Sequence, residues 1–112
     1  MKLLMAAAAG LLIAAAWPQL AFSAEWIFCV APSDQDHKIY MTYPLFTSSG
    51  RSAMERDFHR FLEDSGLRHD GVQCPIGEDE QSARSMRQHA DDFNQQRGME
   101  VIPLDWGSAI SR

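Results

Sequence analysis

The first 24 residues are unlike the rest of the chain, and this contrast limits which part of the chain can form a folded domain. Lys2 precedes an uninterrupted run of apolar residues and glycine from Leu3 to Ala16, and Pro18 ends this run. The pattern is typical of a secretory signal peptide. The run is short of the roughly 20 residues that span a bilayer. We therefore expect residues 1–24 to be removed and residues 25–112 to fold as one domain.

Small side chains mark the cleavage site. Cleavage after Ser23 would leave small residues three and one positions before the cut, at Ala21 and Ser23, and cleavage after Ala24 is the alternative. Cys29 lies five residues past Ala24, whereas a lipoprotein carries its cysteine directly after the cut. We therefore expect a periplasmic or secreted protein without membrane attachment.

Removal of the leader changes the composition that has to fold. The whole chain is 46% hydrophobic with a net charge of −5, but the remaining 88 residues are about 36% hydrophobic with a charge of −6. Such a short, polar domain builds a thin core. The acidic balance argues against binding of nucleic acid, which needs a basic surface. It suits a basic protein partner, such as a cationic wall hydrolase that the protein would inhibit.

Cys29 and Cys74 are the two cysteines of the chain, and both come after the leader. An even number of cysteines in an oxidising compartment predicts a disulfide. Closing a loop of about 45 residues would stabilise the domain by about 4 kcal/mol. Free thiols or an intermolecular bond remain the alternatives, and redox or metal chemistry is disfavoured because no Cys-x-x-Cys occurs.

Two strands and a helix are predicted in the first half of the domain. Bulky apolar residues favour a strand at Glu25–Ala31, and alternation favours another at Lys38–Phe46. Pro44 predicts that this second strand is an edge strand or ends near that residue. Ser52 to Glu55 fit a capping box at the start of a helix, which Gly66 ends. The apolar stripe of this helix consists of Met54, Phe58, Phe61 and Leu62.

In the second half of the domain, the sequence predicts a strand, a helix and a last strand. Val72 to Ile76 alternate as a short strand, and Glu78 to Glu80 then place negative charge at the start of a helix. Arg97-Gly98 ends this helix, and Met99–Trp106 forms a strand whose Pro103 marks a sheet edge. The apolar stripe of this helix consists of Ala83, Met86, Ala90 and Phe93.

The element order β-β-α-β-α-β predicts an α+β domain. We expect a two-layer sandwich in which both helices cover one face of a small, mostly antiparallel sheet. The disulfide would tie the first strand to the third.

A set of aromatic and cysteine positions runs through the domain: Cys29, Tyr40-x-x-Tyr43-x-x-Phe46, Phe58, Phe61, Val72-Gln73-Cys74, the helix that contains Ala83, and Trp106. In these residues the chain resembles a family of small secreted proteobacterial domains with two cysteines and no assigned activity. Residues 72–106 are also distantly similar to one β-α-β half of a SPOR-type peptidoglycan-binding domain. This second resemblance implies cell-wall glycan as a ligand, and neither resemblance supplies a catalytic residue.

No pattern of residues indicates an active site. The chain lacks Gly-x-Ser-x-Gly and a glycine-rich phosphate loop, and the neighbouring carboxylates Asp91 and Asp92 diverge on a helix. No recognised metal spacing occurs among the four histidines. We therefore expect neither an enzyme nor a cofactor. The alternative is a small metal-binding protein or enzyme that uses His59 or His69, since Glu55, His59 and Glu63 share one helix face.

Aromatic residues on the predicted strands are the remaining candidates for binding. Trp26, Tyr40, Tyr43 and Trp106 could stack on sugar rings or fill a partner's pocket if they lie on the uncovered sheet face. Tyr40 lies opposite the apolar face of its strand, so we expect it to be the most exposed of the four. The function predicted is that of a monomeric, non-enzymatic binding module of the cell envelope, with a protein partner or, alternatively, glycan as ligand.

Overall fold

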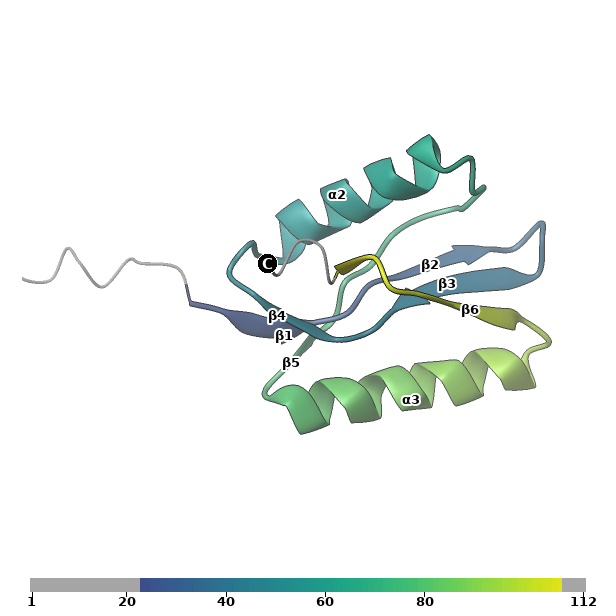
Figure 1. The fold of residues 1–112 in the computed structure, drawn as a ribbon. Coiled ribbons are helices and arrows are strands. Elements are labelled where there is room, and N and C mark those ends of the chain that lie inside the picture. Colours follow the sequence, from purple (N-terminus) through teal and green to yellow (C-terminus); the bar gives the residue numbers. More distant parts are fainter. Residues whose placement is uncertain (1–22, 108–112) are drawn as a thin grey trace, which may run out of the picture.

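The computed structural model describes residues 23–107, and the predicted leader up to residue 22 lies outside this part (Figure 1). Its elements are β1 (Glu25–Ile27), β2 (Val30–Ser33), β3 (Lys38–Thr42), β4 (Leu45–Thr47), α2 (Arg51–Asp64), β5 (Ile76–Gly77), α3 (Glu80–Gln96) and β6 (Glu100–Leu104). The predicted α+β class and the predicted order of strands and helices are confirmed. Neither described helix is both long and apolar enough to cross a membrane.

The strands form two small sheets, in the orders β4-β1-β5 and β2-β3-β6. Each long predicted strand is split in two, because Phe28 and Cys29 separate β1 from β2 and Tyr43 and Pro44 separate β3 from β4. Every pairing is antiparallel except that of β3 with β6. The edge position of β6 agrees with the proline in that strand.

The third predicted strand is only partly formed. Of residues 72–76, Ile76 alone belongs to β5, and Gln73 pairs with Val30 in an isolated bridge. Pro75 has no N–H to donate, although its carbonyl accepts a hydrogen bond from the Phe28 N–H at 3.2 Å. A short strand therefore replaces the longer one expected from the alternation.

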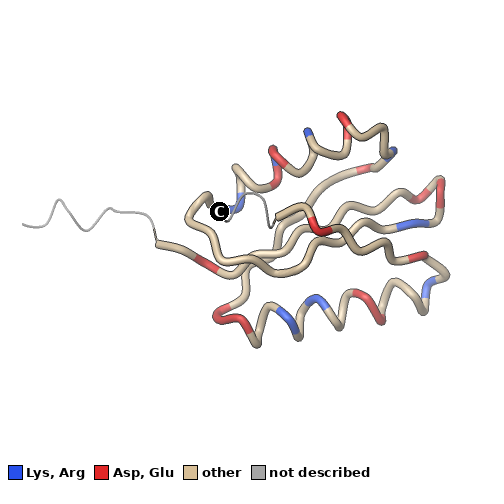
Figure 2. Tube along the Cα trace, viewed as in Figure 1, with Lys and Arg blue, Asp and Glu red and all other residues tan. Residues whose placement is uncertain are grey.

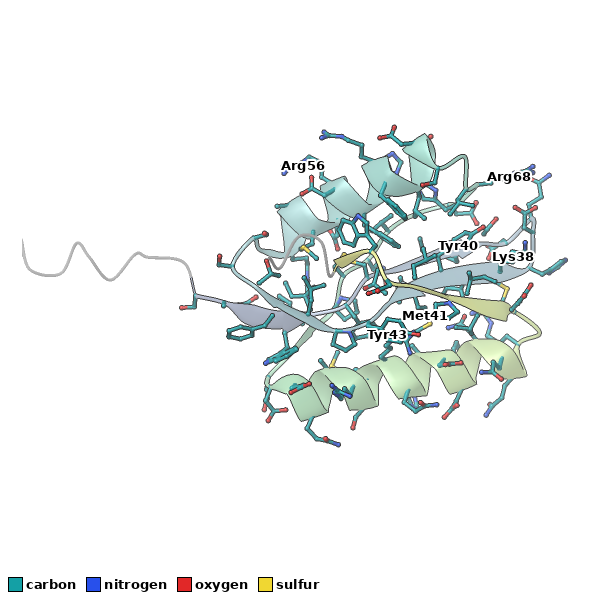
Figure 3. All side chains as sticks on the ribbon, viewed as in Figure 1. Lys38, Tyr40, Met41, Tyr43, Arg56 and Arg68 are labelled. Atoms are coloured by element: carbon teal, nitrogen blue, oxygen red, sulfur yellow. A yellow bond between two sulfur atoms is a disulfide. The ribbon has the colours of Figure 1, made fainter. Side chains whose placement is uncertain are left out.

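The two helices lie on opposite sides of the strands, so the prediction that both cover one face is wrong (Figure 1). The core on the α2 side contains Cys29 and Tyr40, and the core on the α3 side contains Phe28 and Met41. In Figure 3 the side chain of Tyr40 points towards α2, and those of Met41 and Tyr43 point towards α3. The physical reason is the unbroken apolar run in β3, which is buried on both faces of the sheet.

The helix ends agree with the sequence in three cases out of four. Gly66 and Gly98 have positive φ and end α2 and α3 with Schellman hydrogen bonds, such as Leu67 N–H to the Leu62 carbonyl at 2.9 Å. Asp79 caps α3, and its carboxylate accepts from the Ser82 N–H at 2.7 Å. The predicted capping box of α2 is wrong, because Gly50 is the N-cap and Ser52 lies inside the helix.

The predicted disulfide between Cys29 and Cys74 is present, with an S–S distance of 2.07 Å. Both cysteines are fully buried beneath α2. Beside them, the Cys29 N–H donates to the buried Thr42 hydroxyl at 2.8 Å. The bond therefore joins the β1–β2 junction to the segment before β5, as predicted.

Candidate functional site

The four aromatic residues predicted as a binding surface do not form one surface. Tyr40 is only 5% exposed and belongs to the α2 core, so the expectation that it is the most exposed is wrong. Trp106 packs against the same core, with its ring centroid 5.1 Å from that of Phe58. Trp26 is half-buried and Tyr43 is 50% exposed, so these two remain candidates for contact with a ligand.

Trp26 and Tyr43 lie with Phe46 at one end of the sheet, which we call the aromatic end. The Trp26 and Phe46 rings are 5.3 Å apart between centroids, and Phe46 is 53% exposed. The guanidinium of Arg87 from α3 lies 4.6 Å from the centre of the Tyr43 ring, and Arg87 Nε also donates to the Thr42 carbonyl at 2.8 Å. One face of the Tyr43 ring is thus covered by a cation.

A larger site lies between α3 and the sheet. This α3 groove has a volume of about 950 Å³. Three parts of the chain line the groove. The strands and the residues next to them contribute Phe28, Val30, Pro32, Ile39 and Met99, and α3 contributes Met86, His89, Ala90 and Phe93. The third part is the 71–75 segment. The lining is mostly apolar, as is typical of sites that bind by burial.

The helix side of the α3 groove exposes two large apolar side chains. Met86 is 38% exposed and Phe93 is 52% exposed, although both belong to the apolar stripe predicted to face the core. Ala83 is the fully buried member of that stripe. Neighbouring exposed apolar side chains of this size mark an interaction surface more often than isolated ones do.

The strand edge beside the α3 groove is protected from pairing with another strand. The Cys74 N–H donates to the Glu55 carboxylate of α2 at 3.1 Å, and Pro75 has no N–H. Both features are among those that keep edge strands from joining a foreign strand. A ligand of the groove would therefore be held by its side chains rather than by an added strand.

The two histidines considered at the sequence level lie together. His59 Nδ1 is 2.8 Å from His69 Nε2, and His59 Nε2 is 3.6 Å from the Glu63 carboxylate. We call these three residues the histidine cluster. Helical spacing predicted that Glu63 lies near His59. No pattern in the sequence indicated that His69, which follows the turn at the end of α2, would lie beside them. Glu55, the other predicted neighbour, instead binds the Cys74 N–H.

The charged residues are distributed over both helices, the loops and the ends of several strands (Figure 2). All 15 Asp and Glu residues of the chain lie in the described part. On α3, the amide of Gln88 donates to Asp92 at 3.0 Å and the amide of Gln95 donates to Asp91. These two carboxylates are therefore held by neighbours on their own helix, in different directions.

Comparisons with known proteins found no matching family model, no similar curated protein and no similar solved structure.

Proposed function

We propose that this protein is an exported binding module of the bacterial cell envelope that holds an apolar segment of a protein partner in the α3 groove. The observation that carries the proposal is the pairing of two exposed side chains, Met86 and Phe93, with an apolar floor built from the sheet. Complete burial of a fully exposed side chain of this kind is worth about 1.5–3 kcal/mol, and a ligand that covers the exposed parts of Met86 and Phe93 would gain a fraction of this for each. A groove of this kind recognises shape and apolar character.

Export is part of the proposal and has two supports. The N-terminal run with its small-residue exit has the form of a signal peptide. The domain also carries a buried disulfide, and structural disulfides form in oxidising compartments. We therefore place the working protein in the periplasm or outside the cell.

The charge of the domain indicates the chemistry of the partner. Acidic residues outnumber basic ones in the chain. Among the described residues, the charged side chains that line the α3 groove are Asp34 and Arg97, and His89 is the one histidine in the lining. Arg97 is already stacked over the Phe93 ring, at 5.3 Å from its centre. We infer a partner segment that is apolar where it enters the groove and basic around it, since opposite charge speeds and orients association.

Site-specific photo-crosslinking in cells of the source organism tests the proposal. A photoreactive phenylalanine analogue replaces Phe93, and the matched control carries it at Phe46. The two positions are almost equally exposed, at 52% and 53%, but only the first lines the α3 groove. We expect a discrete adduct with a protein from position 93, lost when Met86→Ser is added, and none from position 46.

Two outcomes would contradict this function. Adducts of the same proteins from both positions would mean non-specific capture by any exposed aromatic residue. Absence of an adduct at position 93, in protein shown by mass spectrometry to be exported and oxidised, would mean that the groove has no protein ligand.

Glycan binding at the aromatic end is a second candidate function. It is favoured by the exposed rings of Tyr43 and Phe46 beside Trp26, since sugars are commonly held by stacking on aromatic faces. Sedimentation with purified cell-wall sacculi tests it. We expect Phe46→Ser to abolish co-sedimentation and Phe93→Ser to leave it unchanged, the reverse of the pattern for the α3 groove. Equal loss in both variants, or no co-sedimentation of the parent protein, would rule out this site.

A further inference from the structure

The histidine cluster lies at the C-terminal end of α2, on the side of the sheet opposite the α3 groove. We propose that His59, Glu63 and His69 form a binding site for a divalent transition-metal ion of the zinc type. One ligand atom from each residue lies within 4.8 Å of the other two. Zinc–nitrogen distances of about 2.0–2.1 Å place ligand atoms roughly 3.3 Å apart in a tetrahedron. His69 faces Nδ1 of the His59 ring and Glu63 faces Nε2, so the site closes once the His59 ring turns to point one nitrogen at the ion.

The backbone selects the tautomer of the neutral His69 ring. His69 Nδ1 lies 3.0 Å from the Leu67 carbonyl, which can only accept, so Nδ1 carries the hydrogen and Nε2 presents its lone pair. Leu67 is itself anchored at its N–H, which donates to the carbonyl of the fully buried Leu62. A ligating histidine in a metal site usually donates its other ring N–H to a carbonyl or carboxylate in this way.

The contact between the two imidazole rings would be replaced by the metal. Their facing nitrogens are 2.8 Å apart, and only one hydrogen fits between them. A metal ion would take the place of this hydrogen, with His69 Nε2 and a ring nitrogen of His59 as ligands. Glu63 sits four residues after His59 on the same helix face and would supply an oxygen ligand and one negative charge.

The surroundings favour a cation. The carbonyl groups at the end of α2 carry partial negative charge, and no basic residue lies in the last turn of this helix. Arg68, next to His69 in the chain, is drawn away by an ion pair with Asp36 at 3.8 Å. The charge of Arg68 is thus partly neutralised by a carboxylate outside the cluster, and Arg60, which follows His59 in the chain, is exposed to solvent.

The ligand set selects the kind of ion. Two imidazoles and one carboxylate suit Zn²⁺, Ni²⁺ or Cu²⁺, whereas Ca²⁺ and Mg²⁺ prefer oxygen ligands alone. Three protein ligands leave a position for water, as in zinc sites that are not purely structural. His59 and Glu63 are more than half exposed, so an ion could enter from solvent without opening the fold.

Zinc titration of the disulfide-linked protein, purified without a histidine tag, tests the site. We expect isothermal titration calorimetry to show one Zn²⁺ per chain and no binding of Mg²⁺. The variants His59→Gln, Glu63→Gln and His69→Gln should each weaken zinc binding at least tenfold. The controls His37→Gln and His89→Gln remove histidines outside the cluster and should bind as the parent does. With Co²⁺ in place of zinc, we expect visible absorption from nitrogen–oxygen coordination, absent in His69→Gln.

The proposal is overturned if the parent protein shows no saturable one-to-one binding, or if His69→Gln binds zinc as tightly as the parent. It is also overturned if the His37 and His89 variants lose affinity equally, since the binding would then belong to dispersed surface histidines. Circular dichroism checks that each variant is folded, and the side chains replaced are outside the core. These results are independent of the crosslinking at Phe93, so the two proposals can fail separately.

Discussion

Two acidic residues near helix N-termini, Glu55 and Asp79, differ in how far their sequence position predicts their role. Glu55 has the position of a capping-box residue, but its carboxylate reaches from α2 to the segment before β5 and accepts a hydrogen bond from the Cys74 N–H, beside the disulfide. Asp79 has the expected role at the start of α3. The Ser82 N–H lowers the pKa of its carboxyl below the ordinary 3.8 by donating to the charged form.

Replacing Asp79 should therefore destabilise the domain in a pH-dependent manner. A lowered pKa in the folded state means that the charged cap contributes stability above pH 3.8, and this contribution is lost as the pH falls through the folded pKa. We expect Asp79→Ala to lower the urea midpoint at pH 7, and the difference from the parent to shrink below pH 3.8. Urea unfolding followed by circular dichroism, at pH 7 and at a pH below 3.8, measures the difference in midpoint.

Asp79→Asn is the matched control, since asparagine caps as well as aspartate but does not titrate. Its midpoint at pH 7 should lie close to that of the parent. A difference between Asp79→Ala and the parent that is the same at both pH values would show that the charge of the cap plays no part.

At the scale of the elements, α3 is positioned by a close approach at its first turns. A Cβ built on Gly77 of β5 would lie 2.6 Å from the backbone nitrogen of Ala83, so only glycine fits there. Further along α3, the side chains of Met86 and Phe93 stand at the surface rather than in the core. The helix is thus held tightly to β5 at one end while the α3 groove opens beside its middle and later turns.

Gly77→Ala should push α3 away from β5 and destabilise the domain by about 1–3 kcal/mol, as overpacking does. The control is Gly71→Ala, because a Cβ at Gly71 meets nothing within 4 Å. We expect that variant to be within about 1 kcal/mol of the parent, on the stabilising side if the backbone there suits alanine. Urea unfolding of both variants and the parent tests this. If Gly77→Ala had the same midpoint as the parent, the backbone around Gly77 would have made room for the Cβ without loss of stability.

Much of the fold is set by local signals, and the parts that were mispredicted depend on which face a residue takes. The cysteines, the glycines after each helix and the carboxylates before α3 act through nearby backbone or a single covalent bond, so their roles are readable in the chain. The face of the sheet on which a side chain lies is not set by such local signals. Alternation placed Tyr40 towards solvent, whereas the consecutive apolar residues Ile39, Tyr40 and Met41 fill cores on both sides of the sheet.

The candidate sites were harder to predict than the fold. The α3 groove arises because α3 buries Ala83 but leaves Met86 and Phe93 at its side, which depends on the angle at which a helix meets the sheet. The histidine cluster depends on the turn after α2, which brings His69 back beside His59. Both are tertiary arrangements without a sequence spacing of their own.

For the whole molecule, a layer of two small sheets with a helix on each side divides the core of a small chain into two thin parts. The α2 part holds the disulfide, so the covalent link lies under only one of the two helices. Replacing both cysteines by alanine should lower the free energy of unfolding by about 2–5 kcal/mol. Urea unfolding of this variant, and of the parent with and without reductant, measures the loss. If the reduced parent kept the midpoint of the oxidised one, the bond would not be structural.

The single pairing of the cysteines has a consequence for biogenesis. A chain with two cysteines has only one intramolecular bridge available, so no scrambled isomer of the monomer can form. In the export that we propose, Cys29 would leave the translocation channel before Cys74 and would stay a free thiol while β2 to α2 emerge. Under this proposal, maturation would need an oxidant for one pair of thiols but no disulfide isomerase, and we expect cells without an isomerase to produce the protein at the normal yield.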